Sequence, residues 1–551
     1  MYAPQRIEDR CADNALGEAP QRRRKPVPPL NAARDFKEFK RVEAEKDRRL
    51  PRWREVFNYM MPDRLAFEMK RDKGETPTKP VDSYPAHALQ RGCGNLIAAL
   101  FPHDRVWFEF KAGTDIPEAQ HDAVNEAAER WRDKAFNLLG ESEFGAQLEA
   151  MMPDVFCSLG GMRVDRGQSI AAPADIKAHP LNELFPLLGR SAEICGLMRR
   201  FEEKCCELEA LYPGHPLTLS AGLKDKLATN PDTMIELLEI CRTVPGVGQR
   251  ITVYHFATKD VLLDHVGRDP DEPSPWVIVP WRRVAGEAFG RGPADRALET
   301  ARYYNHARTT EAKAHDRRVD PAFAVDTEAF VSTEVFSPTP RSIIPYSSRL
   351  LQHGGVPFHQ IVDQGNVAYE DAKIQGLKDQ LDDDLFASRT LPPVTDSHGM
   401  TAAEIRVRWM QKLREEGVDF GVLNRSFGLA FVKRYLWVLQ SWGIIPPVLK
   451  VNGKLFEIRY AGPLATAQDA DDAVNLETGV QSIIATVGES LARTRLRLED
   501  VPAEIVRKRN MPSSLIRPEE EAEQMEQAER AAQVAQVAAE NGLLPQQGAP
   551  A

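Results

Sequence analysis

The sequence predicts a mainly helical protein with small β modules, that is, an α+β fold. The first observation behind this prediction is a set of long segments whose apolar residues recur every three or four positions, as on one face of a helix. The second is a smaller set of short segments, such as Val106–Phe110, in which apolar and polar residues alternate as in a half-buried strand. A chain of 551 residues is long enough for two to four domains.

The first 290 residues contain most of the predicted elements. Residues 1–30 are expected to form a disordered basic tail, because the cations Arg22–Lys25 lie among prolines; a specific nucleic-acid contact is the alternative. The segment from Leu181 to Val244 is expected to be mostly helical, with prolines as breaks. Further helices are predicted at Ala33–Pro62, Asp82–Phe101 and Pro117–Met152, and strands at Val106–Phe110, Phe156–Asp165, Arg250–Ala257 and Trp276–Trp281.

Two polar helices, 291–319 and 358–386, are predicted on either side of a short β-rich module. The first holds seven Arg or Lys and four Asp or Glu, and Leu298, Tyr303 and Tyr304 are its only large apolar side chains before Val319. A helix that is polar on most faces needs neighbouring charged helices or water around it rather than a core of its own. The module between them, 320–357, has strand-like runs but too few residues for an independent core. It is expected to pair with a neighbouring copy or with a docked partner.

A loop and a long helix follow. Prolines 392 and 393 disfavour helix within 387–400. Thr401 and Glu404 form a capping box, and the helical pattern behind it continues to Trp442, where Gly443 offers a left-handed exit. At 1.5 Å per residue this pattern spans roughly 60 Å, and the glycines within it predict bends. The elements expected after it are a strand at Leu455–Tyr460, helical segments at Ala467–Leu498 and an Ala/Glu/Gln-rich helix at Pro518–Asn541, which either packs beside copies of itself or is a solvated tail.

Composition narrows the function classes. Lys and Arg total 71 and Asp and Glu total 81, a formal net charge of −10. Such a chain is not built to wrap nucleic acid by neutralising phosphates, although it can surround DNA without gripping it. The seven cysteines show no zinc-ligand spacing, which predicts free thiols in a reducing compartment. With no secretory signal and no apolar run long enough to span a bilayer, the chain is expected to be soluble, intracellular in origin and without stable membrane association.

No catalytic motif is found in the sequence. It has no P-loop, HExxH motif, Gly-x-Ser-x-Gly elbow or kinase signature, and Pro245–Arg250 is interpreted as a plain turn. Asp382, Asp383 and Asp384 are the acidic cluster considered for a metal, but adjacent helical residues point in different directions, which favours a solvated helix end. The prediction is therefore no catalytic residue, no cofactor and no metal site. The tryptophans assigned to core and interface packing are Trp107, Trp276, Trp281, Trp409 and Trp442.

Five short motifs occur in a fixed order along the chain. They are Arg52-Trp53 with Asn58-Tyr59 and Pro62; Ala98-Ala-Leu-Phe-Pro102 with Trp107-Phe108; Pro280–Pro293, ending in Phe-Gly-Arg-Gly-Pro and followed by Asp320-Pro321; Gly399-Met-Thr-Ala-Ala-Glu404; and Gly462-Pro-Leu-Ala465 with Ala467-Gln468. Together they resemble the portal, or head-to-tail connector, proteins of short-tailed double-stranded DNA bacteriophages. The likeness runs from about Arg34 to Gln468 and is weaker from Cys205 to Gly248.

The resemblance implies a portal-type fold of wing, stem, clip and crown, arranged as a ring of twelve copies around a DNA channel. The implied protein lies at one capsid vertex of the virion, is assembled in the bacterial host cytoplasm, and serves genome packaging and ejection. Its implied partners are further copies of itself, a terminase motor, tail or adaptor proteins, major capsid and scaffolding proteins, and the double-stranded DNA that passes through. The implied segments are a wing at 31–290, two stem helices at 291–319 and 358–386, a clip at 320–357, a channel loop at 387–400, a long wing or channel helix and a wing strand at 401–462, and crown or barrel helices with a C-terminal tail at 463–551.

Candidate site residues follow from this assignment. Those of the channel loop are Ser388, Arg389, Thr390, Leu391 and His398. Those of a stem interface or channel surface are Arg302, Arg308 and Lys378. Those of a docking surface on the clip are Phe330, Phe336, Arg341 and Ile343. An acidic pore repels phosphate, so DNA is expected to slide through it rather than be held by it.

Two functions of other classes remain open from the sequence. One is a metal-dependent DNA-processing enzyme that uses the cluster at Asp382. The other is a monomeric helical scaffold or adaptor that binds only protein. A DNA-cleavage assay tests the first, and the particle mass in solution tests the second.

Overall fold

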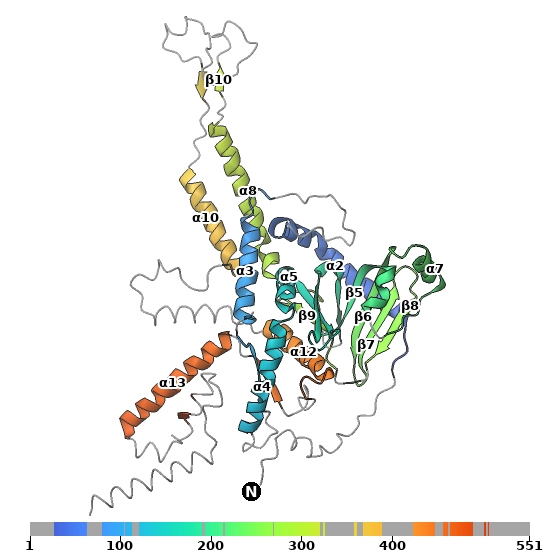
Figure 1. Ribbon diagram of the computed structural model, residues 1–551. Coiled ribbons are helices and arrows are strands. Elements are labelled where there is room, and N and C mark those ends of the chain that lie inside the picture. Colours follow the sequence, from blue (N-terminus) through green and yellow to red (C-terminus); the bar gives the residue numbers. More distant parts are fainter. Residues whose placement is uncertain are drawn as a thin grey trace, which may run out of the picture.

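The structure is a computed structural model, and it shows a mixed α+β fold that is mostly helical with antiparallel sheets, as the sequence predicts. Figure 1 shows two sheets on one side of a helical body and a long pair of helices that projects from it. The structure describes residues 27–62, 80–103, 105–112, 121–189, 193–212, 215–267, 269–270, 272–319, 323–325, 358–360, 367–387, 423–446, 456–460, 463–488, 501–502 and 505.

The largest sheet is a five-stranded antiparallel meander whose strands follow chain order. A satellite core under it includes Tyr212, Leu223 and Ile235. The turn between its third and fourth strands has Gly246 and Gly248 at φ of +80° and +119°, which confirms the predicted plain turn at Pro245–Arg250. The strands are β4 (Leu184–Leu188), β5 (Ile194–Lys204), β6 (Met234–Val244), β7 (Gly248–His255) and β8 (Val261–Val266), and the short helices α6 (Leu208–Leu211) and α7 (Ala221–Thr229) connect β5 to β6.

The prediction that Leu181–Val244 is mostly helical is therefore wrong. Met, Glu and Leu in β6 favour helix locally, but β6 is hydrogen-bonded to β5 on one side and to β7 on the other. Leu237, Leu238 and Ile240 are buried there. Pairing and burial on both edges of a central strand outweigh local propensity.

A second, three-stranded sheet has the order β3-β2-β9, formed by Ala174–His179, Leu159–Arg166 and Trp276–Pro280. The strands predicted at Phe156–Asp165 and Trp276–Trp281 are confirmed as β2 and β9, within three residues. Strand β8 lies between β7 and β9 in the chain, and β7 and β9 belong to different sheets.

A buried polar cluster joins the two sheets. The Glu239 carboxylate in β6 accepts two 2.8 Å hydrogen bonds from Arg163 in β2 and one of 2.6 Å from the Tyr212 hydroxyl. Trp276 Nε1 in β9 donates to the same carboxylate at 3.4 Å. Burial disfavours the charged carboxylate, but Arg163 and these hydrogen bonds lower the pKa of Glu239. The ion pair is thus a fixed connection inside the body rather than a surface contact.

Four helices that the structure describes precede these two sheets in the chain. Helix α2 (Ala32–Met60) begins where the Asn31 side chain accepts from the N–H of Arg34, and α3 (Tyr84–Leu100) follows; both confirm predicted helices. The single helix predicted at Pro117–Met152 is instead α4 (His121–Gly140) and α5 (Phe144–Cys157). The break has a local cause, because α4 ends at Gly140 and the N–H of Phe144 donates to the Ser142 hydroxyl at the start of α5.

Lys46 fixes α2 to the larger sheet from inside. Its ammonium donates to the carbonyls of Leu181, Asn182 and Leu184 at 2.9, 2.6 and 3.3 Å, and lies 3.9 Å from the centre of the Phe185 ring. No carboxylate among the described residues forms an ion pair with the buried Lys46, and burial lowers its pKa to about 7.

The projecting helices are α8 (Pro293–Val319) and α10 (Val367–Asp384). Beyond them, β10 (Phe323–Val325) pairs antiparallel with β11 (Phe358–Gln360). The helix predicted at 291–319 is confirmed. The helix predicted at 358–386 begins only at Val367, because Phe358–Gln360 is hydrogen-bonded as a strand.

The C-terminal elements that the structure describes agree with prediction in kind. A π-helical turn at Asn424–Gly428 leads into α12 (Leu429–Ser441), and Gly443 ends it at φ +69° as predicted. Strand β12 (Phe456–Tyr460) pairs with β1 (Phe108–Ala112), which confirms both predicted strands, and α13 (Pro463–Val487) begins four residues before the helix predicted from Ala467. The predictions that lie outside the described residues are the basic tail up to residue 26, the strand-like runs within 326–357, the loop at 388–400, the Thr401–Glu404 capping box with its helix up to residue 422, and the helix at 518–541.

Aromatic residues from the quoted motifs meet in the core. Phe101 lies 5.0 Å from Trp107 and 4.9 Å from Phe427 between ring centres, which joins α3, β1 and the turn before α12. Trp107, Trp276 and Trp281 are buried as predicted, and Trp442 is half-buried with its Nε1 donating to the Pro173 carbonyl. Trp409 lies outside the described residues.

Candidate functional site: a charged anchor for the helix pair

The start of α8 is fixed by two glycines of the Phe-Gly-Arg-Gly-Pro motif. A Cβ at Gly290 would lie 2.0 Å from the Trp281 carbonyl oxygen, and one at Gly292 would lie 1.8 Å from that of Phe156. The Ser158 hydroxyl donates to the Gly290 carbonyl at 2.9 Å. Only glycine permits this approach of backbone to backbone, so the motif sets the direction in which α8 leaves the body.

Helix α8 has a buried face on which alanines predominate. The exposed fraction of Ala297, Leu298, Ala301 and Tyr304 is 0%. Lys373 of α10 lies over the ring of Tyr303, and Asp384 interacts with Arg296, so the helices run antiparallel. The buried residues on α10 are Ile374, Leu377, Leu381 and Leu385.

The inference that α8 lacks a face for burial within its own subunit is therefore wrong for its first half. Alanines 294, 297 and 301 form that face, and a search for large apolar side chains overlooks them. The inference holds for the second half, where no described side chain after Tyr304 is buried. The distal part of α8 thus stands away from the body, as Figure 1 shows.

Arg302 belongs to an ion-pair network between α2 and α8. Its guanidinium donates to Glu55 of α2 at 2.7 Å from Nε, and to Glu299 one turn earlier on α8 at 2.9 Å. Arg52 of α2 completes the network by pairing with Asp295 at 2.7 Å and with Glu299 at 3.2 Å. The network holds the base of α8 against α2.

Arg308 belongs to a second network, centred on Asp82 just before α3. The Asp82 carboxylate accepts from the Tyr304 hydroxyl at 2.6 Å, from Arg308 Nε at 2.9 Å and from the N–H of Tyr84 at 2.9 Å. Burial opposes ionisation, but these hydrogen bonds and the charge of Arg308 lower the pKa of Asp82. Arg308 also pairs with Glu311.

The end of α10 is held by α3. Arg91 pairs with Asp382 at 2.8 Å, and the Asn95 amide donates to the Phe386 carbonyl at 3.0 Å. The ammonium of Lys378 lies 5.1 Å from the centre of the Tyr84 ring. Gly92 lies under this junction, where a Cβ would be 1.9 Å from the Leu385 carbonyl oxygen. Helix α3 therefore contacts both members of the pair at their base.

The structure brings together Arg302, Arg308 and Lys378, the three predicted stem residues, on one helix pair, and it shows contacts for each within one chain. Their contact with a neighbouring copy stays a prediction. The loop residues 388–398 and the residues at 330, 336, 341 and 343 lie outside the described residues. Sequence reasoning missed the acidic and basic partners on α2 and α3. The Arg52-Trp53 motif and the three-residue spacing of Glu299 from Arg302 were the signals that could have indicated them.

The described residues contain neither a metal-ligand cluster nor a membrane-spanning helix. Among them, no three His, Cys, Asp or Glu side chains gather closely enough to hold a metal ion. Asp382, the first member of the acidic cluster considered for a metal, pairs with Arg91 instead. No helix in the described part of the chain is long and apolar enough to cross a bilayer.

Comparisons with known proteins identify the relatives. The sequence profile of a family described as "Bacteriophage head to tail connecting protein" matches residues 36–516. The "Probable portal protein" of Bordetella phage BPP-1 is 21% identical over 483 residues, 81% of this chain and 81% of that protein.

Two solved structures align with most of this chain but superpose on it with low TM-scores. The "Neck of empty GTA particle computed with C6 symmetry" is 12% identical and covers 76% of this chain and 90% of its own, with a TM-score of 0.33. The "Virion of native gene transfer agent (GTA) particle" is 12% identical and covers 72% of this chain and 89% of its own, with a TM-score of 0.28. At such TM-scores neither carries an argument about this fold.

Proposed function

Because the chain belongs to the bacteriophage head-to-tail connecting protein family, we propose that it is a portal protein: a ring at one capsid vertex through which the genome is packaged and ejected. The family is structural, and the chain is not an enzyme. It is a component of a phage-type virion. The metal-dependent enzyme that the sequence left open is thereby rejected.

The observation that carries the proposal is the helix pair. Helices α8 and α10 are anchored at their base by ion pairs and leave the body together, and the distal half of α8 buries none of its described side chains. A single subunit gains little from such a projection. In a ring, the same helices flank their neighbours' pairs and face an aqueous pore. We assign them as the stem, and by the family resemblance the ring has twelve copies.

Net charge supports a channel that does not retain DNA. The chain carries −10, so the ring is strongly acidic as a whole. An acidic wall repels the phosphate backbone, which favours sliding over binding. In this proposal residues 387–400 project into the pore, where Arg389 touches phosphates only transiently.

The partners follow from the position of a connector. Within the proposal, 320–357 is the clip on which the terminase motor and then tail or adaptor proteins dock, and 31–290 with 401–462 is the wing that meets capsid and scaffolding proteins. Residues 463–551 form the crown or barrel. Assembly takes place in the bacterial cytoplasm. The short-tailed type of phage is proposed from the sequence resemblance alone.

Particle mass tests the proposal against the remaining alternative, a monomeric adaptor. The purified full chain is measured by mass photometry over a dilution series. A ring gives particles of many times the 61.7 kDa chain mass. A species at the chain mass under all conditions, including low salt and added scaffolding protein, would reject the ring.

A further inference from the structure

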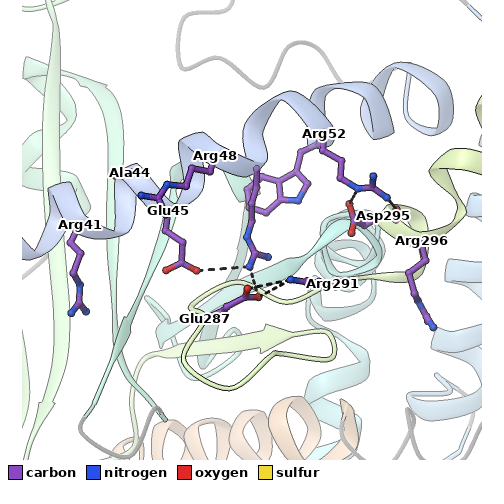
Figure 2. Close-up of a pocket in the computed structure, with 11 residues that line it drawn as sticks. Arg41, Ala44, Glu45, Arg48, Arg52, Glu287, Arg291, Asp295 and Arg296 are labelled. Carbon is purple, nitrogen blue, oxygen red and sulfur yellow. Dashed lines mark hydrogen bonds and ion pairs between the residues drawn. The ribbon is translucent and has the colours of Figure 1, made fainter.

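An arginine-rich groove lies between α2 and the start of α8. Its volume is about 960 Å³, and in Figure 2 α2 forms one wall and the chain from Glu287 to Arg296 the other. Six lining residues are arginines and three are carboxylates, an excess of three positive charges on a chain whose net charge is −10. The arginines are Arg41, Arg48, Arg49, Arg52, Arg291 and Arg296.

Only part of this charge is neutralised within the groove. Arg49 pairs with Glu287 at 2.5 Å, and Arg52 pairs with Asp295 at 2.7 Å. Arg41 and Arg48 are exposed, about two turns apart on one face of α2, and neither forms a hydrogen bond or ion pair with the part of the chain that the structure describes. The groove is therefore suited to an anionic surface.

The outer face of α10 carries the complementary charge. Asp379 and Asp383, one turn apart, are exposed on the side of α10 opposite the buried Leu377 and Leu381. Gly376 lies on the same side, and a Cβ there would meet nothing within 4 Å. A neighbouring surface can thus approach this face closely.

Helices α10 and α2 contact different faces of α8. Arg296 and Tyr303 face α10, whereas Asp295 and Arg302 face α2. Figure 1 shows α10 on one side of α8 and α2 on the other. Because the pair is antiparallel, the end of α10 near Asp383 lies beside the first turns of α8, where Asp295 and Arg296 border the groove. Two unlike surfaces that point in different directions from one subunit can form a heterologous contact, which closes into a ring when the rotation permits.

We infer that the arginine groove of one subunit receives the acidic outer face of α10 from the next copy. The inference rests on the proposed ring and names the two surfaces that close it. Arg41 and Arg48 then face Asp379 and Asp383 of the neighbour, and the contact neutralises both. Attraction between unlike surfaces also suppresses head-to-head association, because like charges would meet there.

The test is a charge swap measured by ring assembly. One variant carries Arg41→Glu and Arg48→Glu, the second carries Asp379→Arg and Asp383→Arg, and the third carries all four changes. Each single-surface variant is expected to raise the concentration of half-assembly by about tenfold or more, equal to about 1.4 kcal/mol. The four-fold variant recovers most of this loss. Lys224→Glu with Lys226→Glu, exposed on α7, is the control of equal charge and leaves assembly unchanged.

The outcomes separate this interface from the proposed function. If the wild type forms rings and either single-surface variant forms them equally well, the interface is wrong while the portal assignment stands. A wild type that never forms rings overturns both. If only the groove reversal weakens ring assembly, and the variant with all four changes does not recover it, the groove has another occupant. If the groove-reversed variant instead forms rings at the wild-type concentration but loses binding to a labelled DNA duplex, the occupant is nucleic acid and the inference is wrong. Circular dichroism of each variant confirms that the subunit is folded.

Discussion

The junction of α3 with α10 predicts opposite effects for two glycine substitutions in one helix. Gly92 and Gly94 are both inside α3, so each exchange to alanine gains about 1 kcal/mol of helix propensity. At Gly94 nothing lies within 4 Å of the new methyl group, and that gain is the whole effect. At Gly92 the methyl would lie 1.9 Å from the Leu385 carbonyl oxygen, a backbone atom that no side-chain rotation can move.

The size of the Gly92 effect follows from this distance. The end of α10 must shift by about 1.5 Å to reach an ordinary contact of 3.4 Å, and the shift lengthens the Arg91–Asp382 and Asn95–Phe386 contacts. Overpacking of this kind costs about 2–3 kcal/mol, which leaves a net destabilisation of about 1–2 kcal/mol after the helix gain. Chemical denaturation measures the free energy of unfolding of both variants, and an unchanged m-value shows that the change is one of stability. A Gly92→Ala variant as stable as Gly94→Ala would refute the close packing of α3 on α10.

Three further predictions concern charged side chains. Glu239→Gln is expected to lower the free energy of unfolding by about 3 kcal/mol, because it leaves Arg163 with a poorer partner. Since folding lowers the pKa of Glu239, its stabilising effect is present above the usual 4.5 and is lost as pH falls, and the variant lacks this part of the acid sensitivity. Between pH 7 and 10.5 the stability of the wild type should rise by about 1.4 kcal/mol per pH unit, since the unfolded Lys46 binds a proton that the folded one has lost, and Lys46→Met should remove this rise. Equal pH slopes in unfolding titrations of both proteins would count against a buried, neutral amine. Arg308→Glu places a carboxylate beside Asp82 and should destabilise the subunit itself by about 1 kcal/mol, in addition to any effect on assembly. Lys313→Glu, on the exposed distal part of α8, should leave the stability of the subunit unchanged, and thermal unfolding of both variants measures the difference.

Elements with strong local signals could be predicted from the sequence. Helices α2 and α3 have regular apolar spacing and recognisable ends, and β1 and β12 alternate. The Gly443 exit was readable because a left-handed φ favours glycine. In each case the pattern of residues close together in the sequence is enough to predict the element.

The errors arise where distant residues decide. Nothing near Glu239 shows that Arg163, 76 positions away, provides its partner, or that β5 and β7 pair with β6 on both sides. Ala294, Ala297 and Ala301 look neutral on a polar helix, and only packing against distant parts of the chain makes them part of the core. The anchor of the helix pair likewise depends on Glu55 and Asp82, which precede their partners by more than 200 positions.

The central claim is that copies of this chain form a ring with α8 and α10 as its stem, and cryo-EM of the purified full chain tests it most directly. The account predicts ring-shaped particles with a central hole, whose reconstruction places the α8–α10 pair around the pore and the five-stranded sheet at the periphery. Single subunits, open filaments, or a ring whose helix pairs point away from the central hole would contradict it.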